Sequence, residues 1–579
     1  MTHVHRLLHE ASLKHADRVA LRFLQRMPPG EGEISLTYRD LLTQLNRSAR
    51  LIRRHLGGER GVVSLVLPNI PQAQVLLWAA EAVGVAQPLN PLLSEAALFE
   101  LMRKAKSRVI VAAGPQAGSD VWHKVQAVAA RLPHPAVVFS VGAEGSDADY
   151  HYDHLLAAFD DGDLPEDWLP QGDAEIAACF HTGGTTGTPR LARHTHANQV
   201  AAARAAARCM GITAGESIIN GLPLFHVAGA IICSLAPLSV GATIVLPTAA
   251  GFRNPEVVRG FWKMVECHRV AIGGAIPTSL SAIAQIDPDG ADISCLRYFL
   301  TGGAPVPDAI GAALQRLTGR PTYQMYGLTE CAGVVALPGI DQPPVPRSAG
   351  RVEPPMEVRI EGTGIGEICV RGPTVFAGYV GEPSPVSRDG WLRTGDLGSI
   401  DADGNVFITG RAKDLIIRGG HNIDPAMIEA CLQAHPDVLM AAAVGWPDAY
   451  AGELPVAYVQ LRERAQVQAD ALREFVLARI DERPACPKHV FVLPELPLTA
   501  VGKIHKPTLR AMAARAAVSE GIEARFPGLS FEIDATPRDS GEIEVAIRAG
   551  SSAQALREFC EELSGALKLR VGLSETFPV

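Results

Sequence analysis

Short apolar runs that alternate with helix-like segments dominate the first four hundred residues. Val62–Pro68 and Ser107–Ala113 are apolar runs of strand length, and Gln72–Val83 between them has the length and composition of a buried helix. A further apolar run spans Ala136–Val141. Strands that alternate with helices along a chain are typical of α/β layers with substantial parallel sheet. We therefore predict an α/β fold whose large, multi-layer N-terminal domain occupies residues 1–410.

The pattern changes after residue 410. Helix-like segments near Pro425–His435 and Ala469–Ile480 alternate with apolar runs near Met440–Gly445 and Val456–Leu461. A unit of about a hundred residues with this order has the size of an ordinary small domain. We predict a smaller α+β C-terminal domain over residues 411–515.

Residues 516–579 carry a separate pattern. Apolar and polar residues alternate near 529–533 and 543–547, the segment near 552–563 is amphipathic, and alternation returns near 567–571. This order predicts a short β-β-α-β extension. The segment contains no recognisable catalytic or binding motif, so packing or dimerisation is its favoured role. A homodimer stays an open alternative.

Charge and cysteine content exclude several classes of protein. The chain has 53 basic and 62 acidic residues, a formal net charge of −9, without long runs of one sign. A nucleic-acid-binding protein usually presents a basic face, so no nucleic acid is expected as a partner. The ten cysteines form no C-x-x-C pair, which argues against zinc and disulfide frameworks. Reduced thiols in a cytoplasmic protein fit better.

No segment predicts a membrane anchor. The first twenty residues contain polar and charged residues throughout, so a signal peptide is not expected. The longest apolar stretch, Ile231–Pro247, is interrupted by serine and threonine and is too short for a transmembrane span. We predict that it forms a buried passage from helix to strand.

The stretch from Thr182 to Arg190 is rich in glycine and threonine and follows the apolar run Ala177–Phe180. Glycines let backbone N–H groups approach a polyphosphate, and threonine hydroxyls can bind phosphate oxygens or Mg²⁺. The candidate phosphate-binding residues are Thr182, Gly183, Gly184, Thr185, Thr186, Gly187 and Arg190. The spacing is not that of a Walker A loop. Composition alone fits an ordinary turn equally well, but the order T-x-G-T-T-G-x-P followed by a base is more specific.

Six further motifs follow this loop. They are PLFHVAG at 223–229, TGGAP at 301–305, YGLTE at 326–330, WLRTGD at 391–396, GRAKD with GGHNI within 410–423, and LPLTAVGK at 496–503. In this order they resemble the motifs of the adenylate-forming superfamily, which includes acyl-CoA synthetases, luciferases and peptide-synthetase adenylation domains. The resemblance covers about residues 10–515 and leaves the last segment unexplained.

The resemblance implies an ATP-dependent enzyme that converts a carboxylic acid to acyl-AMP, releases pyrophosphate and then forms a thioester with CoA. It implies that Glu330 and Thr185 hold Mg²⁺, because hard oxygen donors suit this ion. Asp396 and Arg411 would bond the ribose. The remaining nucleotide contacts implied are those of Gly302, Gly303, Ala304, Tyr326, Gly327 and Thr329.

Lys503 is the residue that we expect to drive adenylation. A flexible ammonium can reach the carboxylate and the α-phosphate together and stabilise the charge that develops between them. The resemblance also implies that the C-terminal domain is mobile, that Lys413 lies at its hinge, and that Gly419 and Gly420 then line a narrow pantetheine passage. By composition alone, Lys503 is an ordinary solvated lysine, and the two glycines are an ordinary turn.

His226 lies in the motif that borders the acid site in this superfamily, and we include it among the catalytic candidates. Amino-acid-activating relatives carry an aspartate in this neighbourhood, whereas His226 is followed by apolar residues. The sequence therefore favours a fatty or other hydrophobic acid. A core histidine is the alternative for His226.

Three positions depart from the usual pattern. Gly183 stands where Ser or Thr is usual, Arg190 where Lys is usual, and Met427 where Glu is common. Arginine keeps the charge of lysine but not its geometry. Two other functions stay open at this point: an acyl-AMP ligase that loads a carrier-protein thiol, and a nucleotide-binding scaffold that has lost catalysis.

Overall fold

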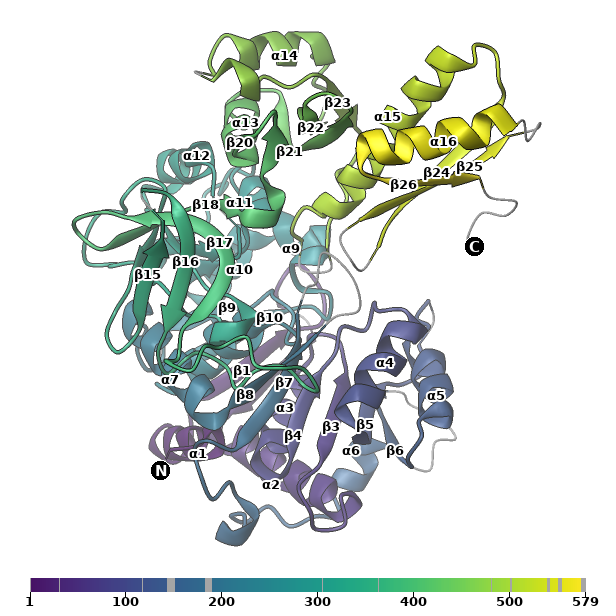
Figure 1. The fold of residues 1–579 in the computed structure, drawn as a ribbon. Coiled ribbons are helices and arrows are strands. Elements are labelled where there is room, and N and C mark those ends of the chain that lie inside the picture. The colour runs from purple at the N-terminus through teal and green to yellow at the C-terminus, as the bar shows by residue number, and fades with distance from the viewer. Residues whose placement is uncertain are drawn as a thin grey trace.

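The computed structural model describes residues 2–30, 32–116, 118–142, 151–182, 190–304, 306–362, 364–480, 482–499, 502–538, 542–549 and 554–573. Two mainly parallel sheets form its N-terminal part (Figure 1). The six-stranded sheet has the order β6-β5-β3-β4-β7-β8, and only the β7–β8 hairpin is antiparallel. Its strands are β3 (Val62–Val66), β4 (Val85–Pro88), β5 (Ser107–Ala113), β6 (Val137–Val141), β7 (Ile176–His181) and β8 (Leu191–Thr195).

The second parallel sheet has seven strands in the order β13-β12-β11-β9-β10-β1-β2. Only the pair β1–β2 is antiparallel. The strands are β1 (Val19–Leu24), β2 (Glu33–Thr37), β9 (Ser217–Ile219), β10 (Thr243–Pro247), β11 (Val270–Gly274), β12 (Tyr298–Gly302) and β13 (Thr322–Met325). Because parallel strands end at one edge, the segments after β11, β12 and β13 leave the sheet side by side.

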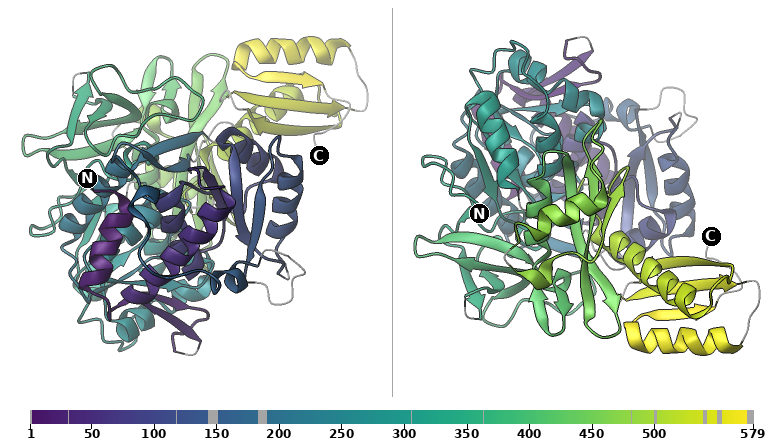
Figure 2. Two further views of the ribbon diagram at one scale, coloured as in Figure 1. Left: turned by 90° about the horizontal axis from the view of Figure 1, so that it is seen from below. Right: turned by 90° about the horizontal axis from the view of Figure 1, so that it is seen from above.

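Helices form three layers around the two sheets (Figures 1 and 2). The middle layer shares one core with both sheets and contains α1 (Val4–Lys14), α2 (Tyr38–His55), α3 (Pro71–Val83), α7 (His196–Met210), the π-helical segment η2 (Ala228–Leu235) and the short α8 (Ala236–Leu238). The outer faces are covered by α4 (Glu95–Ala105) and α5 (Val121–Arg131) on one sheet, and by α9 (Pro255–Arg259), α10 (Phe261–His268), α11 (Pro277–Ile283) and α12 (Asp308–Thr318) on the other. All side chains of α3 except that of Gln72 are buried, as a helix between two sheets requires.

A five-stranded antiparallel sheet follows in the chain, with the order β14-β18-β17-β16-β15. Its strands are β14 (Ser348–Arg351), β15 (Glu357–Glu361), β16 (Gly366–Arg371), β17 (Leu392–Ile400) and β18 (Asn405–Arg411). Tyr326 and Tyr379 belong to its hydrophobic core. This sheet therefore packs directly against the segment that follows β13.

The C-terminal domain is built on the strands β19 (Ile416–Arg418), β20 (His421–Ile423), β21 (Val438–Asp448), β22 (Gly452–Leu461) and β23 (Val490–Leu493). The helices α13 (Pro425–Gln433) and α14 (Ala469–Leu477) pack on one face. The long helix α15 (Lys506–Arg525) packs on the other, where Leu509, Ala513 and Ala517 meet residues of β21 and β22.

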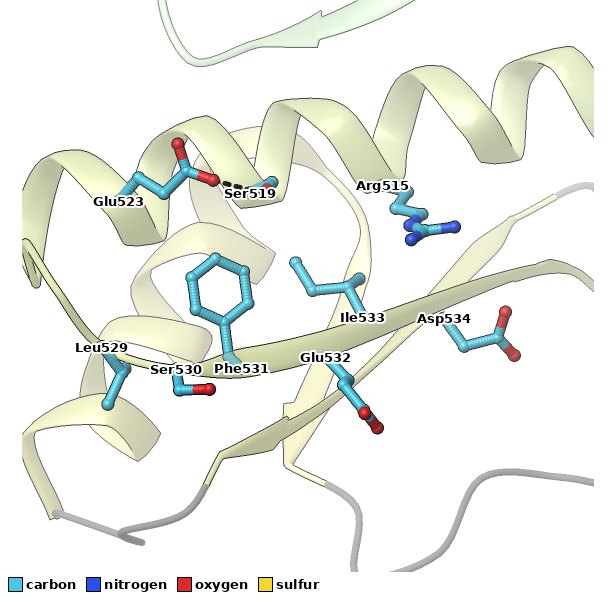
Figure 3. Close-up of a pocket in the computed structure, with 9 residues that line it drawn as sticks. All are labelled: Arg515, Ser519, Glu523, Leu529, Ser530, Phe531, Glu532, Ile533 and Asp534. Carbon is cyan, nitrogen blue, oxygen red and sulfur yellow. Dashed lines mark hydrogen bonds between the residues drawn. The ribbon is translucent and has the colours of Figure 1, made fainter.

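The extension consists of β24 (Phe531–Pro537), β25 (Ile543–Ala549), α16 (Gln554–Leu567) and β26 (Arg570–Leu573). Its core also takes Ala514, Val518 and Ile522 from α15, so this helix is shared with the C-terminal domain. The predicted boundary at residue 515 falls inside α15. An open groove of about 780 Å³ lies between α15 and the edge strand β24. It is lined by Arg515, Ser519, Glu523 and residues 529–534, which Figure 3 shows.

Most predicted elements are present. The strands and helices expected near residues 62–141 and 425–480 occur within a few residues of their predicted limits. The passage at Ile231–Pro247 runs from η2 through α8 into β10 and is buried. One prediction was wrong: Leu567 ends α16 instead of beginning the last strand, which starts at Arg570. The helix α15 was not predicted.

All ten cysteines are free, as their spacing predicted. Among the described residues, no helix has the length and apolar character needed to cross a membrane.

Candidate active site

The glycine- and threonine-rich loop connects the antiparallel strands β7 and β8. The N–H group of Thr182 donates to the carbonyl of Arg190 at 2.8 Å and closes the base of the loop. The predicted residues Gly183, Gly184, Thr185, Thr186 and Gly187 lie outside the described part of the chain, so their roles stay predictions. The described ends of the loop continue the hairpin, which places the loop at the end of β7.

Arg190 is linked to Glu330, the predicted Mg²⁺ ligand, by the side chain of Tyr379, which contacts both residues. Its guanidinium lies 4.0 Å from the centroid of the Tyr379 ring, and its Nη1 is 4.0 Å from Oε2 of Glu382. The Tyr379 hydroxyl donates to Oε1 of Glu330 at 2.6 Å. The sequence did not single out Tyr379. Its contacts link the base of the loop to Glu330.

The adenine and YGLTE motifs follow the neighbouring strands β12 and β13, so the sheet brings Gly302–Ala304 next to Tyr326–Glu330. Gly327 has a local reason to be glycine, because a Cβ there would lie 1.9 Å from the carbonyl oxygen of Gly333. The carbonyl of Thr329 is within 2.7 Å of Nε2 of the buried His194. The segment is thus fixed from two sides.

Asp396 and Arg411 lie directly opposite each other on β17 and β18. Arg411 donates through Nε to Oδ1 of Asp396 at 3.2 Å. The Tyr326 hydroxyl donates to Oδ2 at 2.6 Å, and burial raises the pKa of this tyrosine well above its ordinary value. The structure therefore places two predicted nucleotide residues, Tyr326 and Arg411, around the buried carboxylate of a third, Asp396.

Lys503 reaches this group from the C-terminal domain. Its Cε and Nζ lie 3.0 and 3.2 Å from the position that a Cβ on Gly303 would occupy. Burial and the nearby Arg411 lower the pKa of Lys503 to about 8, although Asp396 acts in the opposite direction. The lysine predicted to drive adenylation therefore lies against the predicted adenine segment.

His226 lies just before η2, near enough to Lys503 for the charge of the lysine to act on it. Burial, Lys503 and His181 together lower the pKa of His226 to about 3, so the ring is neutral at physiological pH. Its Nδ1 accepts a hydrogen bond from the N–H group of Ala228 at 3.2 Å. His181 stacks on Phe225, with ring centroids 5.6 Å apart, and burial lowers its pKa to about 4. His226 can therefore donate a hydrogen bond here but carries no positive charge.

Comparison with known proteins decides the family. Residues 8–380 match the sequence model of the AMP-binding enzyme family, and residues 427–503 match that of the AMP-binding enzyme C-terminal domain. The chain belongs to the AMP-binding enzyme family. The resemblance to the adenylate-forming superfamily is thus confirmed, and the chain is an AMP-forming acid–CoA ligase.

Among curated relatives, marinolic acid–CoA ligase of a Pseudoalteromonas species is 34% identical over 548 residues, covering 89% of this chain and 82% of the relative. Sulfoacetate–CoA ligase of Cupriavidus necator is 32% identical over 498 residues, covering 83% and 93%. The crystal structure of ATP-bound MatB from Rhodopseudomonas palustris has the same fold, with a TM-score of 0.78, 24% identity, and coverage of 89% of this chain and 100% of MatB.

In this AMP-binding enzyme, the two glycines predicted to line the pantetheine passage lie apart from the gathered residues, whereas Lys413 is close enough to Arg411 and Asp396 for their charges to act on it. Gly419 and Gly420 form the exposed turn between β19 and β20, and a Cβ on either would meet no atom within 4 Å. Their role in a pantetheine passage stays a prediction, because it concerns the arrangement after the C-terminal domain has moved. Lys413 lies in the short helix η5 (Ala412–Asp414), directly after β18, where the two parts of the ligase join.

Residues that the sequence missed in this ligase have little signal of their own. Tyr379 and His194 lie outside the quoted motifs, and no role was assigned to His181 from the sequence. Each acts on a predicted residue through a bond or ring contact that folding creates. A titratable side chain directly before the glycine-rich loop was the one available clue to His181.

Proposed function

We propose that this acid–CoA ligase activates a fatty or other hydrophobic carboxylic acid. The proposal rests on the composition of the segment around His226, which we call the acid-site wall. Between Glu216 and Arg253 the chain contains no Asp, Glu, Lys or Arg. The relatives named above act on acids as different as marinolic acid and sulfoacetate, so similarity does not choose the substrate.

The shape of this wall supports an apolar acid tail. From Gly229 to Leu235, every residue of η2 is buried. A Cβ on Gly333 would lie 3.3 Å from Cγ1 of Ile232 and 3.4 Å from Cγ2 of Val227, so the segment after the YGLTE motif packs on the same apolar surface. A substrate ammonium would find no carboxylate partner along this surface. Burying a charge without a partner is costly, which disfavours an amino acid.

We propose the following roles in the reaction. A carboxylate oxygen of the acid attacks the α-phosphorus of ATP, and the bond from this phosphorus to pyrophosphate breaks. Lys503, in its protonated form, stabilises the negative charge that develops between the two anions. A thiol of CoA then attacks the acyl carbonyl and AMP leaves. Residues 1–410 bind ATP and acid, residues 411–515 carry Lys503, and residues 516–579 form an accessory unit.

The residues near the loop fit Mg²⁺. Glu330 is partly exposed, one of its oxygens is held by Tyr379, and the other makes no hydrogen bond to the described residues. A carboxylate oxygen is a ligand that Mg²⁺ prefers, and Mg²⁺ usually completes its shell with water and substrate phosphates. When bound, the ion would neutralise charge on the phosphates. We propose that Glu330, with Thr185 of the loop, holds it.

The proposal is tested with a panel of acids in ATP–pyrophosphate exchange, using the full chain. The panel contains acetate, hexanoate, dodecanoate, and the matched pair 3-phenylpropanoate and phenylalanine, which differ by one amino group. We expect hexanoate or dodecanoate to exceed acetate at least tenfold in kcat/KM, because each buried methylene contributes about 0.8 kcal/mol. We also expect 3-phenylpropanoate to exceed phenylalanine.

Fastest exchange with acetate or with phenylalanine would overturn the proposed substrate class. Thioester formation with CoA is measured alongside for every acid that exchanges. The free state of all ten cysteines supports the further proposal of a cytoplasmic location, which fractionation of the host cells tests.

A further inference from the structure

The hairpin that carries Lys503 also contacts the large N-terminal part outside the predicted nucleotide contacts. This second contact surface is formed by Ile276 and Thr278, and we call it the seat. β11 and β12 are parallel neighbours, and the N–H group of Ala275 donates to the carbonyl of Leu300 at 3.1 Å. The segments that follow these strands therefore leave the sheet at the same edge. One of them contains Gly303, which contacts Lys503, and the other contains Ile276 and Thr278.

Thr278 and Ile276 contact the residue directly before Lys503. The Thr278 hydroxyl donates to the carbonyl of Gly502 at 3.1 Å. Gly502 has a φ of +77°, and a Cβ there would lie 2.5 Å from Cδ1 of Ile276. A methyl group at position 502 would therefore have to displace Cδ1 of Ile276, and the positive φ is a conformation that favours glycine.

Hydrogen bonds within the hairpin couple the position of Gly502 to that of Lys503. The N–H of Thr499 donates to the carbonyl of Lys503 at 2.7 Å, and the N–H of Gly502 donates to the carbonyl of Thr499 at 2.8 Å. The N–H of Lys503 donates to the Thr499 hydroxyl at 3.1 Å. With three bonds across the turn, Gly502 and Lys503 form one rigid piece.

We propose that Thr278 is a positioning residue for adenylation, and that the side chain of Ile276 forms the surface against which the backbone of Gly502 packs. The Thr278 hydroxyl anchors Gly502 and thereby holds the Lys503 ammonium against Gly303 while acyl-AMP forms. The inference rests on the proposed role of Lys503. Because Lys503 is assigned to the first half-reaction alone, the influence of the seat is confined to that half-reaction.

The first test compares Thr278→Val with Thr278→Ser in the full chain, using the fastest acid of the panel above. Thr278→Val should lower ATP–pyrophosphate exchange about five- to tenfold, as expected for one lost hydrogen bond, while Thr278→Ser stays within about twofold of the wild type. Thioester formation from chemically supplied acyl-AMP and CoA should change less than about twofold in both. Thr318→Val is the matched control, because the Thr318 hydroxyl donates to the carbonyl of Leu314 within α12.

A second pair of variants tests the packing of Gly502 against Ile276. Gly502→Ala places a methyl group against Ile276 and should reduce exchange more strongly than Thr278→Val. Adding Ile276→Val removes the Cδ1 atom that the methyl group meets, so the double variant should recover part of the loss. Ile276→Val alone should exchange within about threefold of the wild type.

Three results would overturn the inference. The first is unchanged pyrophosphate exchange in Thr278→Val. The second is an equal loss in both half-reactions, which would indicate a merely structural role. The third applies where Thr278→Val fails to fold, and is no recovery of exchange when Ile276→Val is added to Gly502→Ala. Lys503→Ala separates this inference from the role it rests on. If Lys503→Ala leaves exchange intact, the proposed role of Lys503 is wrong; if it abolishes exchange while the Thr278 and Gly502 variants do not reduce it, only the seat is wrong.

Discussion

Lys503 is the group near the gathered nucleotide residues whose charge changes just above neutral pH. Its pKa is lowered to about 8 by burial and by Arg411. The neighbouring rings of His226 and His181 have their pKa lowered to about 3 and about 4, so both are neutral from pH 5 upward. Neither ring therefore adds positive charge near Lys503 that would compete with it for a carboxylate.

Adenylation should therefore weaken at alkaline pH. A lysine with a lowered pKa loses its proton as the pH rises through that pKa, and the proposed chemistry needs the ammonium. We expect kcat/KM for pyrophosphate exchange, which reports the free enzyme, to fall above about pH 8. Lys503→Ala should lower exchange at least about a hundredfold and remove this limb, while sparing thioester formation from supplied acyl-AMP. A pH profile unchanged in the variant would contradict the assignment.

Tyr379 should tune Glu330, the proposed Mg²⁺ ligand. Its hydroxyl donates a hydrogen bond to one oxygen of Glu330, and the guanidinium of Arg190 lies over its ring. Tyr379→Phe keeps the ring but frees the carboxylate to rotate, so we expect a several-fold higher Mg²⁺ concentration for half-maximal exchange. Direct Mg²⁺ titration in the presence of ATP should show the same shift. Tyr323→Phe is the control, because the Tyr323 hydroxyl donates to the backbone carbonyls of Ile340 and Gln342 and not to a carboxylate of the described residues.

Between elements, α3 and α7 are joined by a buried acid–amide pair in the middle layer. Gln199 donates through Nε2 to Oε1 of Glu81 at 2.9 Å, and burial raises the pKa of Glu81 to about 8. Glu81 Oε2 and Gln199 Oε1 have no other hydrogen-bond partner in the described structure. A proton on Glu81 turns its second oxygen into a donor and makes Gln199 Oε1 a suitable acceptor. The helix pair is therefore best satisfied when Glu81 is neutral.

This pair should make stability depend on pH. A carboxyl group whose folded pKa is raised contributes stability below its ordinary pKa, and that contribution is lost as the pH rises through about 8. We expect the Tm of the wild type to fall between pH 6 and pH 9 by roughly several degrees more than that of Glu81→Gln, which keeps a neutral partner for Gln199. Glu463→Gln, at an exposed position, is the control. Parallel curves for wild type and Glu81→Gln would show that Glu81 is ionised in the core.

Over the whole molecule, α15 is the element that connects the C-terminal domain to the extension. One side of this helix packs on β21 and β22, and the other packs in the core of β24, β25 and α16. The extension projects from the C-terminal domain in Figures 1 and 2. Because one continuous helix serves both cores, the extension should follow any movement of the C-terminal domain as a single body.

Two buried leucines separate the roles of these cores. Leu509 and Leu556 are both almost fully buried, the first between α15 and the C-terminal domain, the second in the extension. Replacing either by Ala should cost about 2–5 kcal/mol locally. We expect Leu509→Ala to reduce pyrophosphate exchange, because α15 begins three residues after Lys503, whereas Leu556→Ala should raise amide hydrogen exchange only in the extension. An equal loss of activity in both would show that the extension supports the site.

Sequence reasoning was most successful where local pattern and chemistry coincide. Buried strands such as Ser107–Ala113 were predicted because an uninterrupted apolar run has few other uses. It missed α15 because Leu509 and Ala513 face one core while Val518 and Ile522 face another, so no single apolar stripe marks the helix. At the site, it selected Tyr326, Asp396, Arg411 and Lys503 by motif, but not Tyr379 or Thr278, which no motif marks.

The sequence by itself determined the kind of chemistry: a glycine- and threonine-rich loop, hard oxygen donors, and a lysine in an order of motifs that resembles the adenylate-forming superfamily. These are properties of residue types and their spacing along the chain. The tertiary structure alone decided which of them meet. Parallel strands brought the segment of Gly303 beside the segment of Thr278, and paired strands brought Arg411 to Asp396. Packing of the C-terminal domain brought Lys503 against Gly303 and Gly502 to Thr278, because folding alone brings these segments together.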